Sequence, residues 1–289
     1  MSKKLIYVNS SGAKLEITNS APFLLQQFDP TANVNIYNTK GLKQDGSTYL
    51  GNTLDVRDIT LQIAVMAASK EELNILKQKI NTAFNPKLGE GYLIYSDNIK
   101  ERKVKCIVNK LPYFTVVSED TLAICLINLT ANNPFWVDTY ESKEEIAVWL
   151  GDFEFELEFT EDGIEMGHRE PSLIVNVTNN GDVECGIKIE FKALATVVNP
   201  SIININTREY MKINKIMTAG EVITVNTAFG EKRMESYLNG VTSNALKYID
   251  LGSTFLQLDT GDNLLRYDAD ENIDNLEVSL YYITQYLGV

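Results

Sequence analysis

The sequence predicts a mainly β protein of two domains, with one α-helix in the first domain. Short runs that alternate apolar and polar residues recur between turn-forming residues, whereas only one segment, which begins near residue 70, has helical spacing. The length of 289 residues and the hydrophobic fraction of 44% suit a folded chain of roughly two domains. We expect a β-sheet domain over residues 1–145 and a β-sandwich over residues 146–289, with the core of the sandwich in residues 170–289.

The first domain begins with a predicted hairpin over residues 4–18, in which two alternating strands flank a turn at residues 9–12. Residues 38–53 are rich in Asn, Gly and Asp, and we expect a polar loop there. After the helix, three further strands are predicted, over residues 92–95, 103–108 and 121–129.

A long strand and the helix form the middle of this domain. The strand is predicted from Leu54 to Val65, and its alternation shifts by one at Arg57 and Asp58, which indicates a bulge or a bend. The helix is predicted over residues 69–84. It begins with a Ser-Lys-Glu-Glu capping box, in which the serine hydroxyl accepts an amide hydrogen bond and the last glutamate reaches back. It ends before Pro86, because proline cannot continue the helical ladder.

The second half has turn signals at regular intervals and no convincing helix, which is typical of a β-sandwich or barrel. Residues 153–159 alternate apolar side chains with glutamates, so we expect a half-buried strand with an acidic exposed face. Four further strands are predicted over residues 172–178, 186–192, 221–227 and 232–238. Turns are expected at residues 179–182, 229–230, 239–240, 252–253 and 260–263.

The chain is acidic, with 26 Lys and Arg against 39 Asp and Glu and a formal net charge of −13. Residues 1–150 carry 16 basic and 16 acidic side chains, and residues 151–289 carry 10 and 23, so the whole excess lies in the second half. Acidic surfaces repel phosphate backbones and anionic lipid headgroups. The longest apolar run, residues 63–68, is far shorter than the ~20 residues that span a bilayer. We therefore expect no nucleic-acid binding, no membrane segment and no secretion signal.

Residues that could carry catalysis are scarce. His168 is the only histidine, and it stands in a polar segment that we expect to be an exposed loop, so a Ser-His-Asp or Cys-His arrangement has a single available base. Cys106, Cys125 and Cys185 form no C-x-x-C pair, and the apolar surroundings of the first two indicate buried thiols. Residues 89–91 begin like a dinucleotide-binding loop, but the third glycine is missing and a strand follows.

Two further patterns could indicate a ligand-binding site. Asp268, Asp270 and Asn272 have the spacing of the first three ligands of an EF-hand, but the required glycine and final glutamate are missing, so a solvated loop over residues 268–274 is the better interpretation. Aromatic residues could stack on sugars if they formed an exposed cluster, although aromatics at strand spacing more often belong to a core. The aromatics concerned are Trp136, Tyr140, Trp149, Tyr281, Tyr282 and Tyr286. We therefore predict no catalytic, cofactor-binding or metal-binding residue, and no cofactor.

A series of short motifs runs along nearly the whole chain. In the first half they are PFLL at 22–25, QDG at 44–46, LDVRDI at 54–59, SKEEL at 69–73, FNPK at 84–87, GEG at 89–91 and NPFW at 133–136. In the second half they are NNGD at 179–182, NPSI at 199–202, GEVITV at 220–225 and LQLDTGDN at 256–263. In their order and spacing these motifs resemble the distal tail protein (Dit) family of siphovirus-type tailed bacteriophages.

The resemblance implies a structural protein rather than an enzyme. It implies that the N-terminal domain forms a hexameric ring that joins the distal tail tube to tail-tip or baseplate proteins, while genome DNA passes through the lumen without specific binding. It also implies a galectin-like or carbohydrate-module-like C-terminal β-sandwich that projects outward and docks receptor-binding proteins. The protein would then be a virion component, assembled in the cytoplasm of the bacterial host and encoded by a phage, a prophage or a phage-tail-like bacteriocin.

Three functions remain to be compared. A self-assembling tail hub needs exposed strand edges or loops that pair with neighbouring copies, and the polar segment over residues 38–53 is a candidate. The acidic half of the chain would then face outward from the ring. The alternatives are a carbohydrate-binding, lectin-like module for attachment to the host wall, although residues 171–289 contain no sugar-binding signature, and a wall-degrading hydrolase, which the lone His168 disfavours.

Overall fold

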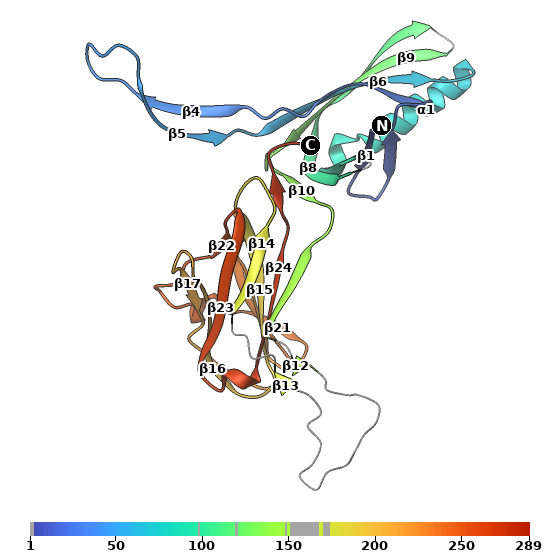
Figure 1. Cartoon of the computed structure of the whole chain (residues 1–289). Coiled ribbons are helices and arrows are strands. Elements are labelled where there is room, and N and C mark those ends of the chain that lie inside the picture. Colours follow the sequence, from blue (N-terminus) through green and yellow to red (C-terminus); the bar gives the residue numbers. More distant parts are fainter. Residues whose placement is uncertain (1–2, 98, 119–120, 148, 151–167, 170–173) are drawn as a thin grey trace. The chain divides into compact units, whose positions relative to one another are not determined.

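A computed structural model describes residues 3–97, 99–118, 121–147, 149–150, 168–169 and 174–289. The chain divides into two units (Figure 1). Unit 1 comprises Met1–Thr139 and Tyr286–Val289, and unit 2 comprises Tyr140–Gln285. The fold is mostly β, as the sequence predicts, and the described residues contain one α-helix. The last four residues of the chain therefore belong to unit 1 with the N-terminal strands, although the whole of unit 2 separates them along the chain.

Unit 1 is built around one antiparallel sheet. Its strands are β1 (Lys4–Val8), β2 (Lys14–Ile17), β3 (Phe23–Asp29), β6 (Arg57–Met66), β7 (Glu90–Ser96), β8 (Glu101–Ser118), β9 (Leu122–Ala131), β10 (Trp136–Asp138) and β25 (Gln285–Tyr286). The main path runs β2-β1-β7-β8-β9-β6-β3, and β10 pairs with both β8 and β25. The two outermost strands of the path meet through a bridge between Thr18 and Leu24, so the sheet nearly closes on itself.

Helix α1 (Lys70–Ala83) contributes one face to the core of unit 1, through Leu73 and Ile80. Alternate residues of β6, such as Ile59 and Leu61, are fully buried in the same core. The predicted capping box is present. Ser69 accepts a hydrogen bond from the Glu72 amide at 3.2 Å, and the Glu72 carboxylate accepts one from the amide of Ala68 at 2.7 Å.

The segment between β3 and β6 differs most from the sequence prediction. The polar loop expected over residues 38–53 is confirmed for residues 40–47 and wrong on either side of them, because β4 (Val34–Thr39) and β5 (Thr48–Leu54) pair as a two-stranded antiparallel ribbon. Gly41 and Gly46 lie in the turn of this ribbon, whereas Asn38 and Gly51 lie at a β-bulge and Asn52 at an exposed position, where packing does not select β-branched side chains. The long strand expected from Leu54 to Val65 is two strands with a break at residues 55–56. We call residues 34–54 the arm.

Unit 2 is a β-sandwich, which confirms the predicted architecture. Its seven-stranded sheet contains β11 (Ser142–Ala147), β15 (Cys185–Ala193), β19 (Val222–Asn226), β20 (Arg233–Leu238), β21 (Val241–Asn244), β22 (Gln257–Leu258) and β24 (Leu276–Tyr282). Its five-stranded sheet contains β14 (Ile174–Asn179), β16 (Val197–Asn204), β17 (Tyr210–Lys212), β18 (Ile216–Met217) and β23 (Gly261–Glu271). Phe191 from the first sheet and Ile202 and Tyr267 from the second lie in one buried cluster, as expected for two sheets packed face to face.

Most predicted turns of unit 2 lie between strands. Asn239 and Gly240 both have positive φ, of 51° and 81°, and join β20 to β21 in the way that a two-residue hairpin requires. The turn predicted at residues 260–263 and the loop predicted over residues 268–274 are wrong in part, because β23 begins at Gly261 and continues through Asp268 to Glu271; Thr260 and Asn272 lie outside the strand, as predicted. An antiparallel strand with one solvated face can carry these acidic residues, so their charge did not exclude a strand.

The region around residue 168 differs as well. His168 lies in the short strand β13 (His168–Arg169), which pairs with β12 (Trp149–Leu150), rather than in a loop. The acidic strand expected over residues 153–159 lies outside the described residues.

Candidate assembly surfaces

The arm has two chemically different faces. In an antiparallel ribbon, paired residues point to the same side and successive residues alternate. Val34 pairs with Leu54 and Ile36 pairs with Asn52, which places their side chains on one face. The opposite face carries polar side chains, and the hydroxyl oxygens of Tyr37 and Thr53 lie 3.1 Å apart there.

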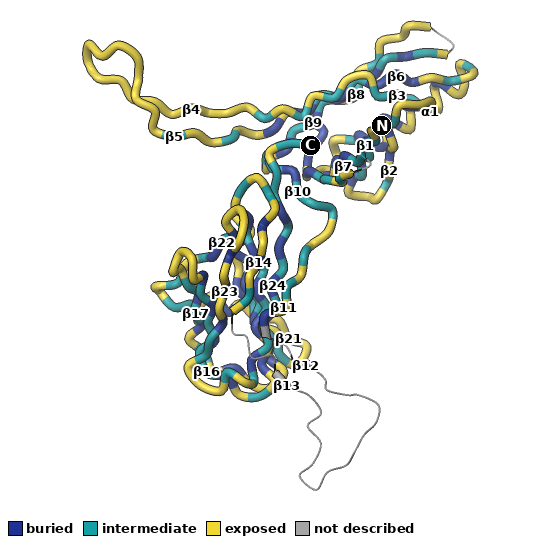
Figure 2. The backbone as a smooth tube through the Cα atoms, in the orientation of Figure 1, coloured by how far each residue is buried: buried dark blue, intermediate teal, exposed yellow. Residues whose placement is uncertain are grey.

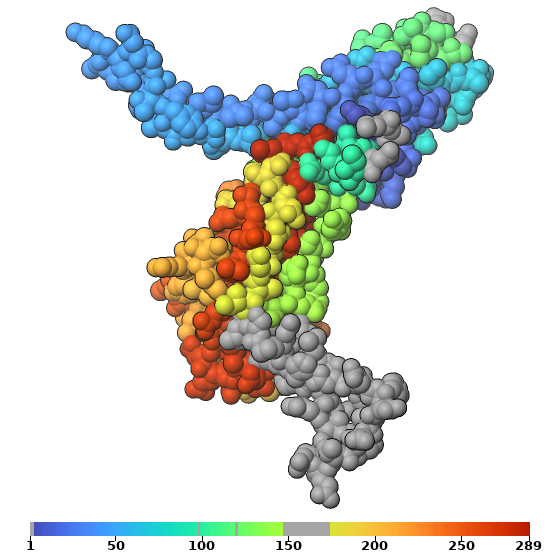
Figure 3. Space-filling model, in the orientation of Figure 1, coloured from blue at the N-terminus to red at the C-terminus, as the bar shows by residue number. Residues whose placement is uncertain are grey.

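The face that carries Val34 and Ile36 is apolar and uncovered, and we call it the apolar face of the arm. Ile36 is 62% exposed, Val34 is 50% exposed, and Tyr49, which follows on this face beyond the bulge, is 59% exposed. Figures 2 and 3 show the arm as an exposed ribbon that extends from the body of unit 1. An isolated two-stranded ribbon is at best marginally stable in water, and its unpaired edges are templates for other strands. The arm therefore has the properties of an element that is completed by a partner.

The outer end of the β8–β9 hairpin is a second apolar surface of unit 1. Leu111, Tyr113 and Val117 are each more than 60% exposed. Over residues 108–118, β9 is the one strand that pairs with β8 in the described part of the chain, so the other edge of β8 is open. Pro112 suits an open edge because proline has no amide hydrogen to leave unpaired. A shallow hollow of about 300 Å³ lies beside it, lined by Gln62, Tyr113, Thr115, Ile124 and Leu126.

A buried arginine lies at the base of the arm. Arg57 is 2% exposed, and its guanidinium donates to three main-chain carbonyl oxygens, those of Pro134 at 2.6 Å, Leu287 at 2.8 Å and Pro30. Burial lowers the pKa of Arg57 from its ordinary value. The sequence did contain a signal for this site, since Arg57 is a charged residue at the start of a strand with a buried apolar face.

The residues Tyr286–Val289, which we call the closing segment, are held by a second arginine. The Arg102 guanidinium lies 3.4 Å from the centre of the Tyr286 ring and donates to the Gly288 carbonyl oxygen. The Tyr286 hydroxyl donates to the Asp138 carboxylate at 3.2 Å. No sequence signal linked residues so far apart along the chain.

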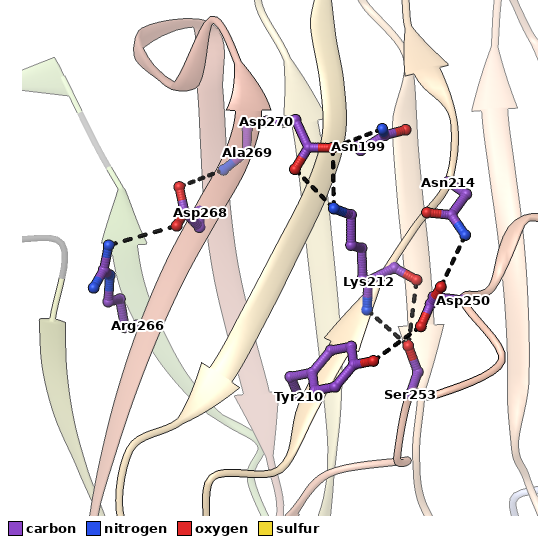
Figure 4. A network of polar contacts seen from close by, with 10 residues as sticks. All are labelled: Asn199, Tyr210, Lys212, Asn214, Asp250, Ser253, Arg266, Asp268, Ala269 and Asp270. Atoms are coloured by element: carbon purple, nitrogen blue, oxygen red, sulfur yellow. Dashed lines mark hydrogen bonds and ion pairs between the residues drawn. The ribbon is translucent and has the colours of Figure 1, made fainter.

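The acidic residues considered for calcium belong to a polar network on unit 2 (Figure 4). The Asp270 carboxylate accepts from the Lys212 ammonium at 2.7 Å and from the Asn199 amide at 2.8 Å, which lowers its pKa. Asp268 accepts from Arg266 at 3.5 Å instead of facing a shared centre with Asp270. Among the described residues, no group of three or more His, Cys, Asp or Glu is arranged to hold a metal ion.

A second part of this network surrounds Asp250. Its carboxylate accepts from the Tyr210 hydroxyl at 3.0 Å and from the Asn214 amide at 3.1 Å, and these bonds lower its pKa (Figure 4). The carboxylates of the network are thus already engaged by side chains of the same surface.

Among the described residues of unit 2, Glu221 is the one buried carboxylate. It is 1% exposed and accepts from the Lys215 ammonium, from the Ser236 hydroxyl at 2.5 Å and from the Thr218 amide at 3.3 Å. Burial alone would raise the pKa of Glu221, but these hydrogen bonds outweigh burial and hold the pKa below its usual value. Every partner therefore stabilises the charged form of Glu221 inside the folded unit.

The remaining candidates from the sequence are buried or closely packed. Cys106, Cys125 and Cys185 are free and buried, and burial raises the pKa of each thiol to about 12, which confirms the prediction of buried thiols. Gly91 is needed for packing, because a Cβ there would lie 2.6 Å from the Val8 carbonyl oxygen.

The aromatic residues do not form one exposed cluster. Trp136 is fully buried in unit 1, where it meets Phe28 edge to face with ring centres 6.4 Å apart. Tyr282 is buried in unit 2, whereas Tyr140 is 67% exposed. The side chain of Trp149 is outside the described set. In the described part of the chain, no helix is both long and apolar enough to cross a membrane.

Two family models match the sequence. Residues 10–120 match the phage tail protein RIFT-related domain, and residues 180–286 match the C-terminal domain of siphovirus-type tail components. The fold and these matches, which together span more than half of the chain, define a structural protein of a phage tail or baseplate. The chain belongs to the siphovirus-type distal tail protein family.

Solved structures share the fold at low sequence identity. The Dit protein (gp 19.1) of phage SPP1, described as a paradigm of the hub of the adsorption apparatus in phages that infect Gram-positive bacteria, is 11% identical, with a TM-score of 0.69 over 98% of this chain and 99% of that chain. A chain of the phage p2 baseplate, in its activated conformation with Sr, is 11% identical, with a TM-score of 0.50 over 100% of both chains. No curated protein matches the sequence significantly.

Proposed function

We propose that the chain assembles into a ring, hexameric by the family resemblance, that joins the distal end of the tail tube to tail-tip and receptor-binding proteins. The observation that carries this proposal is the arm, whose apolar face is not covered by the described chain. Ile36 and Tyr49 on this face are about 60% exposed. The arm extends away from the body of unit 1, so a neighbouring copy can receive it. A contact between two different surfaces of the same chain repeats head to tail and closes into a ring when the rotation permits.

The distribution of charge supports a division of roles between the two units. Unit 1 carries 15 basic and 13 acidic residues, whereas unit 2 carries 11 and 26. A nearly neutral unit can approach its own copies without strong repulsion, and an acidic unit remains soluble and can meet basic partner surfaces. We therefore assign ring formation to unit 1 and the docking of outer tail proteins to unit 2, with a structural rather than an enzymatic role for both. Assembly would take place in the host cytoplasm.

The experiment compares two variants that add the same negative charge to adjacent residues of the arm. Ile36→Asp places a carboxylate on the apolar face, and Asn35→Asp places one on the polar face. We expect rings for the wild-type protein and for Asn35→Asp in negative-stain images and light scattering, but monomers for Ile36→Asp, because a charge buried without a partner opposes the contact. Ile36 is exposed in the single chain, so thermal unfolding of the monomer should not change.

Two outcomes would contradict the proposal. A wild-type protein that stays monomeric across micromolar concentrations would refute the ring. Equal loss of rings in both arm variants would show that added charge, rather than the apolar face, controls assembly. Saturable binding of host-wall glycans by a monomeric protein would favour the lectin-like alternative instead.

A further inference from the structure

The arm joins the body of unit 1 through two short segments that lack strand pairing. Residues 30–33 connect β3 to β4, and residues 55–56 connect β5 to β6. A main-chain hydrogen bond of 2.9 Å, from the Asp55 amide to the Asn33 carbonyl oxygen, links the two segments. We call these two connecting segments the legs of the arm. Because strand pairing is interrupted in both legs, side by side, the arm can pivot there.

Arg57 connects the two segments of this pivot to the closing segment. Through the Pro30 carbonyl oxygen it holds the leg that leads into β4, and Arg57 itself follows directly after the other leg. Through the Leu287 carbonyl oxygen, at 2.8 Å, it reaches the closing segment. Hydrogen bonds from a charged donor are stronger than neutral ones, and a buried guanidinium has no water to exchange them for. The three segments are thus joined at one side chain.

The closing segment is itself anchored to the body of unit 1, independently of the arm. Arg102, from β8, stacks on Tyr286 and donates to the Gly288 carbonyl oxygen. Residues of the closing segment and of the pivot line a shallow hollow of about 360 Å³, which includes Pro30, Leu54 and Leu287. The segment therefore lies against the base of the arm while its other contacts hold it to the sheet.

We propose that the closing segment braces the arm and sets its direction, with Arg57 as the positioning residue. This inference rests on the proposed function, because a fixed direction matters only if the arm must meet a neighbouring copy. Ring closure requires each contact to repeat with the same angle, and an arm that pivots loses entropy when it is captured. The brace removes that freedom before assembly.

The test removes residues 287–289 and measures two properties separately. The first is hydrogen exchange of the Asp55 amide at the pivot, compared with the Ile127 amide in β9, which pairs with Leu61 inside the sheet and not with the pivot. Loss of the charged hydrogen bond should accelerate exchange of the Asp55 amide about tenfold and leave that of Ile127 unchanged. The second is the fraction of chains in rings at a fixed concentration, which should fall.

Two further variants separate the brace from general destabilisation. Arg102→Met loosens the closing segment without shortening the chain or touching the arm, and it should reproduce both effects in weaker form. Leu287→Ala keeps the carbonyl oxygen that Arg57 binds, so both properties should remain as in the wild-type protein. Equal acceleration at Asp55 and Ile127 would mean that the deletion merely weakens unit 1, which overturns the proposal.

The outcomes also distinguish this inference from the proposed function. Unchanged exchange at Asp55 after the deletion refutes the brace even when rings form. Faster exchange at Asp55 with a normal ring fraction refutes its role in assembly. If the wild-type protein forms no ring, the proposed function fails, and the link to assembly fails with it, while the exchange data still report whether the segment holds the arm.

Discussion

Replacing Glu221 with glutamine measures how much one buried carboxylate contributes to unit 2. The side chain is 1% exposed, and its oxygens accept from the Lys215 ammonium, the Ser236 hydroxyl and the Thr218 amide. Glutamine keeps the size of the side chain but removes the charge. Lys215 then loses its counter-ion. In addition, the amide group of the glutamine is a donor, and it replaces a carboxylate oxygen that accepted hydrogen bonds from neighbouring donors.

The magnitude follows from the burial of the two partners. Removing one member of a buried ion pair costs about 3–5 kcal/mol, because the other charge is left uncompensated. The Lys215 side chain is 21% exposed, so water replaces part of the lost interaction. We therefore expect a loss in the free energy of unfolding of about 2–3 kcal/mol. For a unit of this size, that lowers the unfolding midpoint by roughly 5–10 °C at pH 7.

The effect depends on pH in a defined direction. Although burial raises the pKa of Glu221, its hydrogen bonds hold the net value in the folded protein below the ordinary 4.5 that we assign to the unfolded chain. The stabilisation is therefore fully present above that ordinary value and is lost as the pH falls through the lower, folded value. Once the carboxyl group is protonated it resembles the glutamine, so the midpoints of the wild-type protein and Glu221→Gln should converge in acid.

Differential scanning calorimetry at several pH values tests this reasoning. Glu235→Gln is the matched control, because Glu235 makes an exposed ion pair with Arg233 at 3.8 Å in the same unit, and such pairs contribute about 0–1 kcal/mol. A shift for Glu221→Gln no larger than that of the control at pH 7 would refute the reasoning. So would a shift that persists undiminished at acidic pH.

Two other predictions concern unit 1 and the thiols. At pH 8 the native protein should resist alkylation by iodoacetamide at Cys106, Cys125 and Cys185, since burial raises each pKa to about 12, and all three should react in denaturant; rapid labelling of the native protein, read by mass spectrometry, would contradict their burial. Ser69→Ala should lower the free energy of unfolding of unit 1 by about 1 kcal/mol in urea titration, because the Glu72 amide loses its acceptor, whereas Ser69→Asp should retain most of the stability.

Local patterns were sufficient to predict the elements that are determined by local chemistry. Helix α1 begins at its capping serine and ends before Pro86, because both signals act within a few residues. The strands of the sandwich were predicted from alternation, because one face of each sheet is buried and the other is solvated. The hairpin at Asn239 and Gly240 followed from the need of the turn for positive φ.

The arm and its base could not be predicted in this way. The described part of the chain buries neither face of the arm, so the arm lacks the apolar–polar alternation that a core imposes on a strand. Its Asn and Gly content indicated a loop instead. The contact between Arg57 and Leu287 joins residues 230 positions apart through a main-chain oxygen, which every residue possesses. A sequence pattern marks side chains, and it contains no information about which distant carbonyl a buried arginine will bind.

The charge of unit 2 and the apolar face of the arm together predict how assembly depends on salt, and this dependence tests what drives assembly. Each added copy brings 11 basic and 26 acidic residues in unit 2, so copies repel one another through a net charge of −15, most strongly at low ionic strength. At 0.1 M salt, repulsion between charges more than about 10 Å apart is largely screened. Salt does not weaken the burial of apolar side chains such as Ile36. The fraction of chains in rings, measured by light scattering, should therefore rise between about 10 mM and 150 mM salt. A fall over the same range would mean that ion pairs, rather than the arm, hold the copies together.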